Sequence, residues 1–136
     1  MPNNIESMPT IFLAEDDIDD QELLAEAFLG IDPGIHLKSF STGKKFITHL
    51  DSLPDDEIPS MVILDYNIPE INGADILKHL EENERYRDVV KLVWSTSNAS
   101  LYEESCIALG AKAYLVKPTN VSGLNDLAKK MLDFIN

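Results

Sequence analysis

The sequence of 136 residues lacks the usual marks of a secreted or membrane-spanning protein. Its single cysteine, Cys106, cannot form a disulfide within the chain, which excludes a disulfide-rich secreted scaffold. No apolar run approaches the roughly 18 residues that suggest a membrane span. The first residues also lack a basic stretch followed by an apolar one, the pattern of a secretory leader. We therefore expect a cytoplasmic protein.

Basic residues are scarce: 11 Lys and Arg stand against 24 Asp and Glu, for a net charge of −13. The imbalance is uneven, because residues 1–68 hold 14 acidic and 3 basic residues whereas residues 69–136 hold 10 and 8. Binding to phosphates depends on Lys and Arg. We therefore expect no nucleic-acid partner and no membrane partner.

The length suits a single domain. We expect residues 1–8, which are mostly polar, to form a flexible N-terminal tail, and residues 9–136 to form one folded domain. The apolar fraction of 44% is that of an ordinary globular protein.

Short apolar runs rich in β-branched residues alternate with segments of helical periodicity. The alternation predicts an α/β fold, a doubly wound five-stranded parallel sheet with five helices, because such connections are right-handed and cover both faces of a sheet. Strands are expected at residues 10–14, 35–40, 61–64, 89–94 and 113–116, and helices at about 19–30, 42–50, 73–80, 102–109 and 124–135.

Residues with reactive side chains follow the predicted strands, at the edge where such sheets bind ligands. They are Glu15-Asp16-Asp17, Asp65, Ser95-Thr96 and Lys117-Pro118. Clustered carboxylates repel one another unless a cation joins them, and oxygen ligands without His or Cys favour Mg²⁺. A carboxylate beside that ion can attack phosphorus and form an aspartyl phosphate, while a lysine and a hydroxyl hold the phosphoryl oxygens.

This set of residues resembles the receiver domain of two-component response regulators, the CheY-like fold, from about Thr10 to Ile135. Each motif alone is weak, but their order along the chain is specific. The motifs are Leu13-Ala14-Glu15-Asp16-Asp17, Leu64-Asp65-Tyr66-Asn67-Ile68-Pro69, Asn72-Gly73, Val93-Trp94-Ser95 and Lys117-Pro118.

The resemblance implies a phosphoacceptor and a Mg²⁺ site. Asp65 would accept the phosphoryl group and bind the metal. Asp16 would be the direct acidic metal ligand, Glu15 would act through a metal-bound water, and Asn67 would supply its backbone carbonyl.

The resemblance also implies a set of switch residues. Lys117 would pair with the phosphoryl group, Ser95 would close on it, and Tyr114 would follow this closure. Pro118 would hold the Lys117–Pro118 peptide, which is often cis in this family. Thr96 stands where a smaller alanine is common, so its side chain could narrow the approach of water to Asp65.

By this resemblance the chain is a stand-alone receiver that takes a phosphoryl group from a histidine kinase or a histidine phosphotransfer protein. Its only reactions would be Mg²⁺-dependent self-phosphorylation and autodephosphorylation, so it is not expected to be an enzyme with a separate substrate. A surface of the fourth helix, fifth strand and fifth helix would select a downstream target protein, with Tyr102, Lys112 and Lys129 as candidate contacts. We expect a monomer or a weak homodimer.

Other conspicuous residues have ordinary structural interpretations. Asp19, Asp20 and Glu22 are expected to be a solvated helix start, and the acidic residues of 51–57 a solvated loop. The three histidines show no metal spacing and no paired acid in sequence. Cys106 and Trp94 are expected in the core.

Three rival functions remain. A haloacid-dehalogenase-type phosphatase would need a second Asp two residues after the nucleophile, where this chain has Asn67. A pseudo-receiver would bind partners without phosphorylation. A flavodoxin-like cofactor protein would need a phosphate-cradling loop after the first strand, which the sequence lacks.

Overall fold

The structure, a computed structural model, describes residues 9–96 and 100–135, so the expected tail at residues 1–8 lies outside the described residues. Five parallel strands form one sheet in the order β2-β1-β3-β4-β5. Their order reverses between β1 and β3, where parallel sheets bind ligands. The strands are β1 (Thr10–Ala14), β2 (His36–Phe40), β3 (Met61–Asp65), β4 (Val90–Ser95) and β5 (Ala113–Val116).

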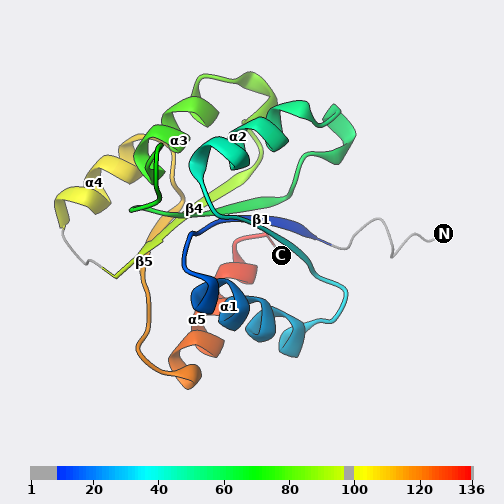
Figure 1. Cartoon of the computed structure of the whole chain (residues 1–136), viewed down its shortest axis with the longest axis vertical. Helices are drawn as coiled ribbons and strands as arrows, with labels where there is room; N and C mark the ends of the chain where they lie inside the picture. Colours follow the sequence, from blue (N-terminus) through cyan, green and yellow to red (C-terminus); the bar gives the residue numbers. More distant parts are fainter. Residues whose placement is uncertain (1–8, 97–99, 136) are drawn as a thin grey trace.

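Helices cover both faces of the sheet, as the alternating pattern predicts. In Figure 1, α2, α3 and α4 lie over one face and α1 and α5 over the other. None of the described helices is long and apolar enough to cross a membrane. The helices are α1 (Ile18–Ile31), α2 (Gly43–Ser52), α3 (Gly73–Glu81), α4 (Ser100–Ala108) and α5 (Val121–Asp133), with single 3₁₀ turns η2 (Asp55–Glu57) and η3 (Glu84–Tyr86).

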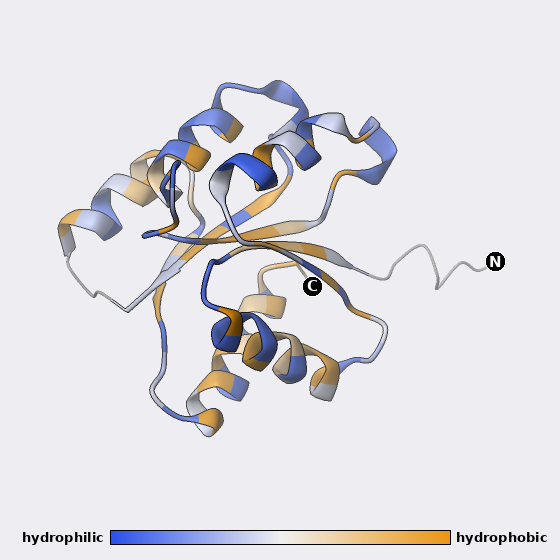
Figure 2. Cartoon of the chain, in the orientation of Figure 1, coloured by the Kyte–Doolittle hydropathy of each residue, from blue (hydrophilic) through white to orange (hydrophobic). Residues whose placement is uncertain are grey.

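The central strand β3 shows why the sheet needs both layers. All five of its residues are buried. Val62 and Leu64 pack into the core under α2, α3 and α4, whereas Met61 and Ile63 pack into the core under α1 and α5. Figure 2 shows the apolar strands between the two helix layers, with polar residues gathered on the outer faces of α2 and α3. Burying each such side chain stabilises the fold by about 2 kcal/mol relative to exposure.

Helix α1 begins earlier and ends later than the sequence predicts. Asp17, not Asp19, is its N-cap, since the Asp17 carboxylate accepts a hydrogen bond from the backbone N–H of Asp20 at 3.1 Å. The helix ends at Ile31, one residue past Gly30. Several neighbouring acidic residues could serve as the N-cap, so the sequence alone does not identify Asp17.

The expected solvated loop at 51–57 is wrong for its first residue. The Asp51 carboxylate lies 2.9 Å from Nε2 of His79 and accepts a hydrogen bond from the hydroxyl of Tyr86. The guanidinium of Arg85 donates to the Asp51 backbone carbonyl at 3.3 Å. Asp51 therefore joins the end of α2 to α3 and η3, through residues at least 28 positions away that sequence proximity does not reveal.

Removing the Asp51 carboxylate is expected to destabilise the fold. Tyr86 is fully buried, and burial together with the hydrogen bond to Asp51 raises the pKa of its hydroxyl to about 12, so that it remains a donor. Asp51→Ala would leave this donor unpaired and lower the free energy of unfolding by about 2 kcal/mol. Urea denaturation measures the change. Asp56→Ala, at an exposed position of η2, is the control and is expected to stay within about 0.5 kcal/mol; equal effects of the two changes would contradict the role of Asp51.

Candidate functional site

Three carboxylates meet where the strand order reverses. Glu15 directly follows β1 and Asp65 ends the neighbouring strand β3. One oxygen of each of Glu15, Asp16 and Asp65 lies within 4.8 Å of the others. Glu15 is fully buried and Asp65 is 6% exposed, whereas Asp16 is exposed. The structure thus brings together the three acidic residues that the sequence selects for a metal site.

The backbone around Glu15 holds its side chain in place. The Glu15 N–H donates to the carbonyl of Phe40 in β2 at 2.9 Å, and its own carbonyl accepts from the side-chain amide of Gln21. Its carboxylate accepts a hydrogen bond from the N–H of Asp17 at 3.1 Å. These bonds fix the strand end at the start of α1, so the carboxylate points into the site.

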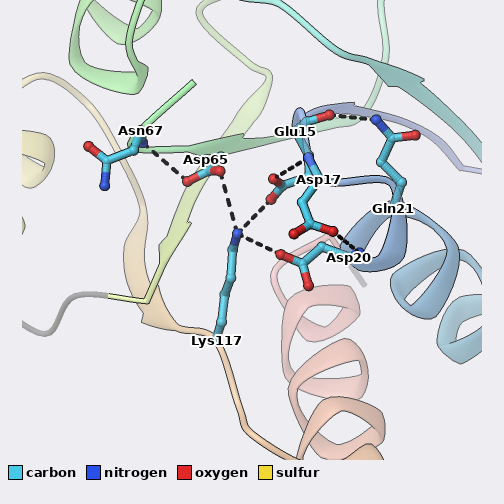
Figure 3. Close-up of polar contacts among 7 residues, drawn as sticks. All are labelled: Glu15, Asp17, Asp20, Gln21, Asp65, Asn67 and Lys117. Carbon is cyan, nitrogen blue, oxygen red and sulfur yellow. Dashed lines mark hydrogen bonds and ion pairs between the residues drawn. The ribbon is translucent and has the colours of Figure 1, made fainter. Parts of the chain in front are cut away.

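Lys117 crosses from β5 to the carboxylates. Figure 3 shows its ammonium group directed at the acidic side chains from β1, α1 and β3. Its Nζ lies 2.7 Å from Oε1 of Glu15, 2.9 Å from Oδ2 of Asp20 and 3.4 Å from Oδ2 of Asp65. The lysine lies close to the phosphoacceptor predicted from the sequence, at the edge of the sheet opposite the strand starts.

Asp20 is the site residue that the sequence interpretation missed. It was expected to be a solvated acid at a helix start, but it forms an ion pair with Lys117. The pair spans 97 positions in the chain, so only the strand order places the two residues together. The one usable signal is that a helix starting at Ile18 sets Asp20 in its first turn, beside the end of β1.

The electrostatics favour a cation. Burial raises the pKa of Glu15 to about 8, although the hydrogen bond from Lys117 opposes the rise. Burial would lower the pKa of Lys117, but its hydrogen bonds with Glu15 and Asp20 outweigh this and raise it. One ammonium faces the carboxylates of Glu15, Asp20 and Asp65, with Asp16 close by, so the negative charge is not balanced by the protein alone.

The loop after Asp65 depends on a close backbone approach. The Asn67 N–H donates to Oδ1 of Asp65 at 3.1 Å, and the Gly73 N–H donates to the Tyr66 carbonyl at 3.0 Å. A Cβ on Gly73 would lie 2.9 Å from the Asp65 carbonyl oxygen, which is closer than atoms pack. Gly73 therefore lets α3 start directly against the loop that carries Asp65.

The remaining predicted residues lie on β4 and β5. Ser95 is buried at the end of β4, and Thr96 follows it on the surface. Tyr114 is half-buried against the core under α2, α3 and α4. Among the described residues no peptide bond is cis, so the Lys117–Pro118 bond is trans, unlike the form often found in the family.

Two of the expected target contacts are placed differently from the third. Tyr102 lies on α4 and Lys112 is exposed just before β5. Lys129, by contrast, lines a hollow with Glu26 and Gly30 of α1. Its role as a target contact stays a prediction.

The donor set suits a hard cation. All the candidate ligand atoms are oxygens, and among residues 9–96 and 100–135 no other group of three or more His, Cys, Asp or Glu side chains brings its ligand atoms so close. Mg²⁺ prefers such carboxylates and commonly completes its shell with waters and phosphoryl oxygens. An aspartate beside a lysine and a cation is also a suitable nucleophile toward phosphorus.

The chain belongs to the response regulator receiver domain family, whose pattern it matches over residues 11–129. The two-component response regulator ORR5 of Oryza sativa subsp. japonica is 32% identical over 91 residues, which are 67% of this chain and 66% of that protein. ORR3 of Oryza sativa subsp. indica is 24% identical over 127 residues, 93% of each chain. The chain covers less than two thirds of the length of two of these relatives. The matched segment spans 66% of ORR5 and 43% of ORR7 of Oryza sativa subsp. indica.

Solved structures agree with the fold. The phosphorylated cyanobacterial phytochrome response regulator RcpA superposes with a TM-score of 0.86 at 23% identity, covering 95% of this chain and 94% of that one. The response regulator RPA3017 in red light signaling of R. palustris gives 0.82 at 27% identity, with 93% of each chain covered. The Mn²⁺-bound form of the response regulator Rcp1 gives 0.81 at 22% identity over 93% of each. The predicted CheY-like fold is thereby confirmed.

Proposed function

We propose that the domain, residues 9–136, accepts a phosphoryl group on Asp65 and uses the change to control binding of a target protein. The observation that supports this most is the position of Asp65, which is buried, 3.4 Å from the ammonium of Lys117 and within metal-sharing distance of Glu15 and Asp16. The donor would be a histidine kinase or a histidine phosphotransfer protein. The domain would have no reaction beyond its own phosphorylation and dephosphorylation.

Mg²⁺ would be held by Asp16, Asp65 and the backbone carbonyl of Asn67, with Glu15 acting through a bound water. The fit is supported by the all-oxygen donor set and by the unbalanced negative charge at the site. When bound, the ion would neutralise charge on the phosphoryl oxygens. Cation binding would also favour the ionised form of Glu15, because it opposes the burial that raises the pKa of this carboxyl group to about 8.

The chemical step would be a displacement at phosphorus. A carboxylate oxygen of Asp65 forms the new P–O bond while the bond from phosphorus to the donor breaks, and the donor keeps that electron pair. The ammonium group of Lys117, which faces Asp65, would also interact with the oxygens of the transferred phosphoryl group. The hydroxyl of Ser95, one strand away at the end of β4, would donate to a phosphoryl oxygen.

An aromatic contact that the sequence alone does not show supports a conformational response of α4 to phosphorylation of Asp65. Tyr66, the residue after Asp65, stacks on Tyr102 of α4 with ring centroids 4.5 Å apart and planes at 18°. Movement of the Asp65 loop would thus act directly on α4. The proposed target surface of α4, β5 and α5 also carries exposed apolar side chains at Leu101, Ile107 and Val116, which are 69%, 45% and 46% exposed.

The test is covalent labelling of the purified chain. After incubation with acetyl phosphate and Mg²⁺, intact-mass spectrometry is expected to show one added phosphoryl group, and peptide mapping after borohydride reduction to place it on Asp65. Labelling is expected to fail when Mg²⁺ is chelated. An unlabelled protein in the presence of Mg²⁺ would favour the pseudo-receiver instead.

Thr96 is expected to lengthen the lifetime of the phosphorylated form. Its branched side chain follows Ser95 at the rim of the site, where it can hinder an attacking water. Thr96→Ala should shorten the half-life by roughly two- to fivefold, which corresponds to less than 1 kcal/mol in the barrier. Loss of label over time measures it, with Thr48→Ala on the exposed side of α2 as the control. An unchanged or longer half-life would count against shielding.

A further inference from the structure

Residues 33–50 combine an absence of acidic residues with a concentration of basic ones. Residues 33–50 include no Asp or Glu, but they hold Lys38, Lys44 and Lys45, the three basic residues of the first half, together with His36 and His49. The segment forms β2 and most of α2. A local positive surface therefore lies on a protein of net charge −13.

The strand in this segment has a free edge. Among residues 9–96 and 100–135, β2 ends the sheet and pairs only with β1. The His36 N–H donates to the Pro9 carbonyl at 3.1 Å, and the Phe40 carbonyl accepts from Glu15 at 2.9 Å, so both groups point toward β1. Backbone groups alternate in direction along a strand. The N–H and C=O groups of Leu37 and Ser39 therefore point outward along the free edge.

Hollows flank this edge. One of about 650 Å³ lies between Phe40 and the outer side of α2, where Lys44, Lys45 and His49 line it. The His49 ring packs 5.2 Å from the ring of Phe40, and Nζ of Lys38 lies 6.0 Å from the same ring. A second hollow of about 400 Å³ is lined by Leu37, Lys38 and residues of α1. Side chains of an added strand would have space on both sides of β2.

The lysines near the edge are available for a partner. Within the part of the chain that the structure describes, Lys38, Lys44 and Lys45 form no ion pair, whereas Lys117 pairs with three carboxylates. All three are exposed. The large hollow holds one acidic residue, Glu70.

We propose that the free edge of β2 binds an extended acidic segment of a partner protein as a sixth strand of the sheet. The backbone of Leu37 and Ser39 would form the strand ladder, and the lysines would contact carboxylates of the partner. This binding surface is separate from the phosphoryl site and does not rest on phosphorylation of Asp65.

Other occupants fit the surface less well. A second copy paired edge to edge would bring two lysine-bearing strands together, and like charges across a ladder are unfavourable. A nucleic acid carries a negative charge at every phosphate and would extend past the three lysines onto the acidic rest of the protein, whereas a short acidic segment is confined to the edge. A lysine can also protect an edge strand from aggregation without binding anything.

The first test is a titration of the ¹⁵N-labelled chain with a capped octapeptide of alternating Glu and Val. We expect shift changes confined to β2, α2 and the part of α1 that lines the second hollow, slower hydrogen exchange at the Leu37 and Ser39 amides, and weaker binding as salt rises. A Lys-Val octapeptide of the same length is expected not to bind. Absence of binding by the Glu-Val peptide at millimolar concentration, or shift changes elsewhere, would overturn the proposal.

Matched variants distinguish the contribution of the lysines near the β2 edge to peptide binding from the effect of the protein's net charge. Lys38→Glu with Lys45→Glu is expected to weaken peptide binding about tenfold or more. Lys129→Glu with Lys130→Glu on α5 changes the net charge equally and should alter peptide binding less than about twofold.

Ser39→Pro removes an outward N–H without touching the β1 ladder, so binding should be lost while circular dichroism stays unchanged. Equal weakening by both charge reversals, or unaltered binding by a folded Ser39→Pro protein, would contradict strand addition. If Ser39→Pro does not fold, hydrogen exchange of the wild-type chain decides instead, and Leu37 and Ser39 amides that the bound peptide does not slow would contradict strand addition. Edge-to-edge dimers, or DNA bound at the same amides in preference to the peptide, would replace the proposed partner.

Discussion

Asp65→Asn is expected to abolish phosphoryl incorporation from acetyl phosphate and Mg²⁺, a reduction to below detection. The asparagine keeps the shape of the side chain, and its carbonyl oxygen can still accept the hydrogen bond that the Asn67 N–H makes at 3.1 Å. It loses the anionic oxygen that faces Lys117 at 3.4 Å and that would attack phosphorus in the proposed reaction. Phosphoryl incorporation is measured by intact mass after a fixed incubation.

The control must remove a carboxylate from the same acidic region without touching the site. Asp19→Asn does this, because Asp19 is exposed on the first turn of α1. It should label at nearly the wild-type rate. Labelling retained by Asp65→Asn would move the acceptor to another carboxylate, and a matching loss in Asp19→Asn would indicate that the general charge of the region, rather than Asp65, supports the reaction.

The sequence predicts the site because of the way parallel sheets are built. Glu15, Asp65, Ser95 and Lys117 each follow or end an expected strand, and parallel strands bring all their carboxyl ends to one edge. The strands at 10–14 and 113–116 are predicted with the bounds that the structure shows, and the other three differ by at most one residue at each end. The place of these side chains in the fold could therefore be inferred once the strand pattern was clear.

Contacts between helices and loops could not be inferred in this way. Asp20 and Asp51 both look like solvated acids in sequence, yet one pairs with Lys117 and the other with His79 and Tyr86. Their partners lie on distant parts of the chain. A helix could rotate by a fraction of a turn without changing its apolar pattern, so that pattern does not say which polar side chains meet.

Mg²⁺ is expected to raise the melting temperature strongly. Ligand at about 100 times its dissociation constant stabilises the folded state by about 2.7 kcal/mol, which is roughly 10 °C for a domain of this size. Asp16→Asn should remove most of the gain, since Asp16 is the exposed carboxylate within 4.8 Å of Glu15 and Asp65. Differential scanning fluorimetry with and without Mg²⁺ measures the shift, and Asp19→Asn again serves as the control. A wild-type melting temperature that does not change on addition of Mg²⁺ would contradict the metal site.

The Mg²⁺ effect should also depend on pH, because the same carboxylates bind protons or the cation. Burial raises the pKa of Glu15 from its ordinary value of 4.5 to about 8, so the folded chain binds this proton more tightly than the unfolded chain. Without metal, the contribution of Glu15 to stability is therefore present at low pH and is lost as pH rises from 4.5 to about 8. Mg²⁺ favours the ionised carboxylates, so the gain in melting temperature should increase between pH 6 and pH 8. Glu15→Gln cannot titrate at this position and should flatten that increase; the same pH dependence in Glu15→Gln would assign it to another group.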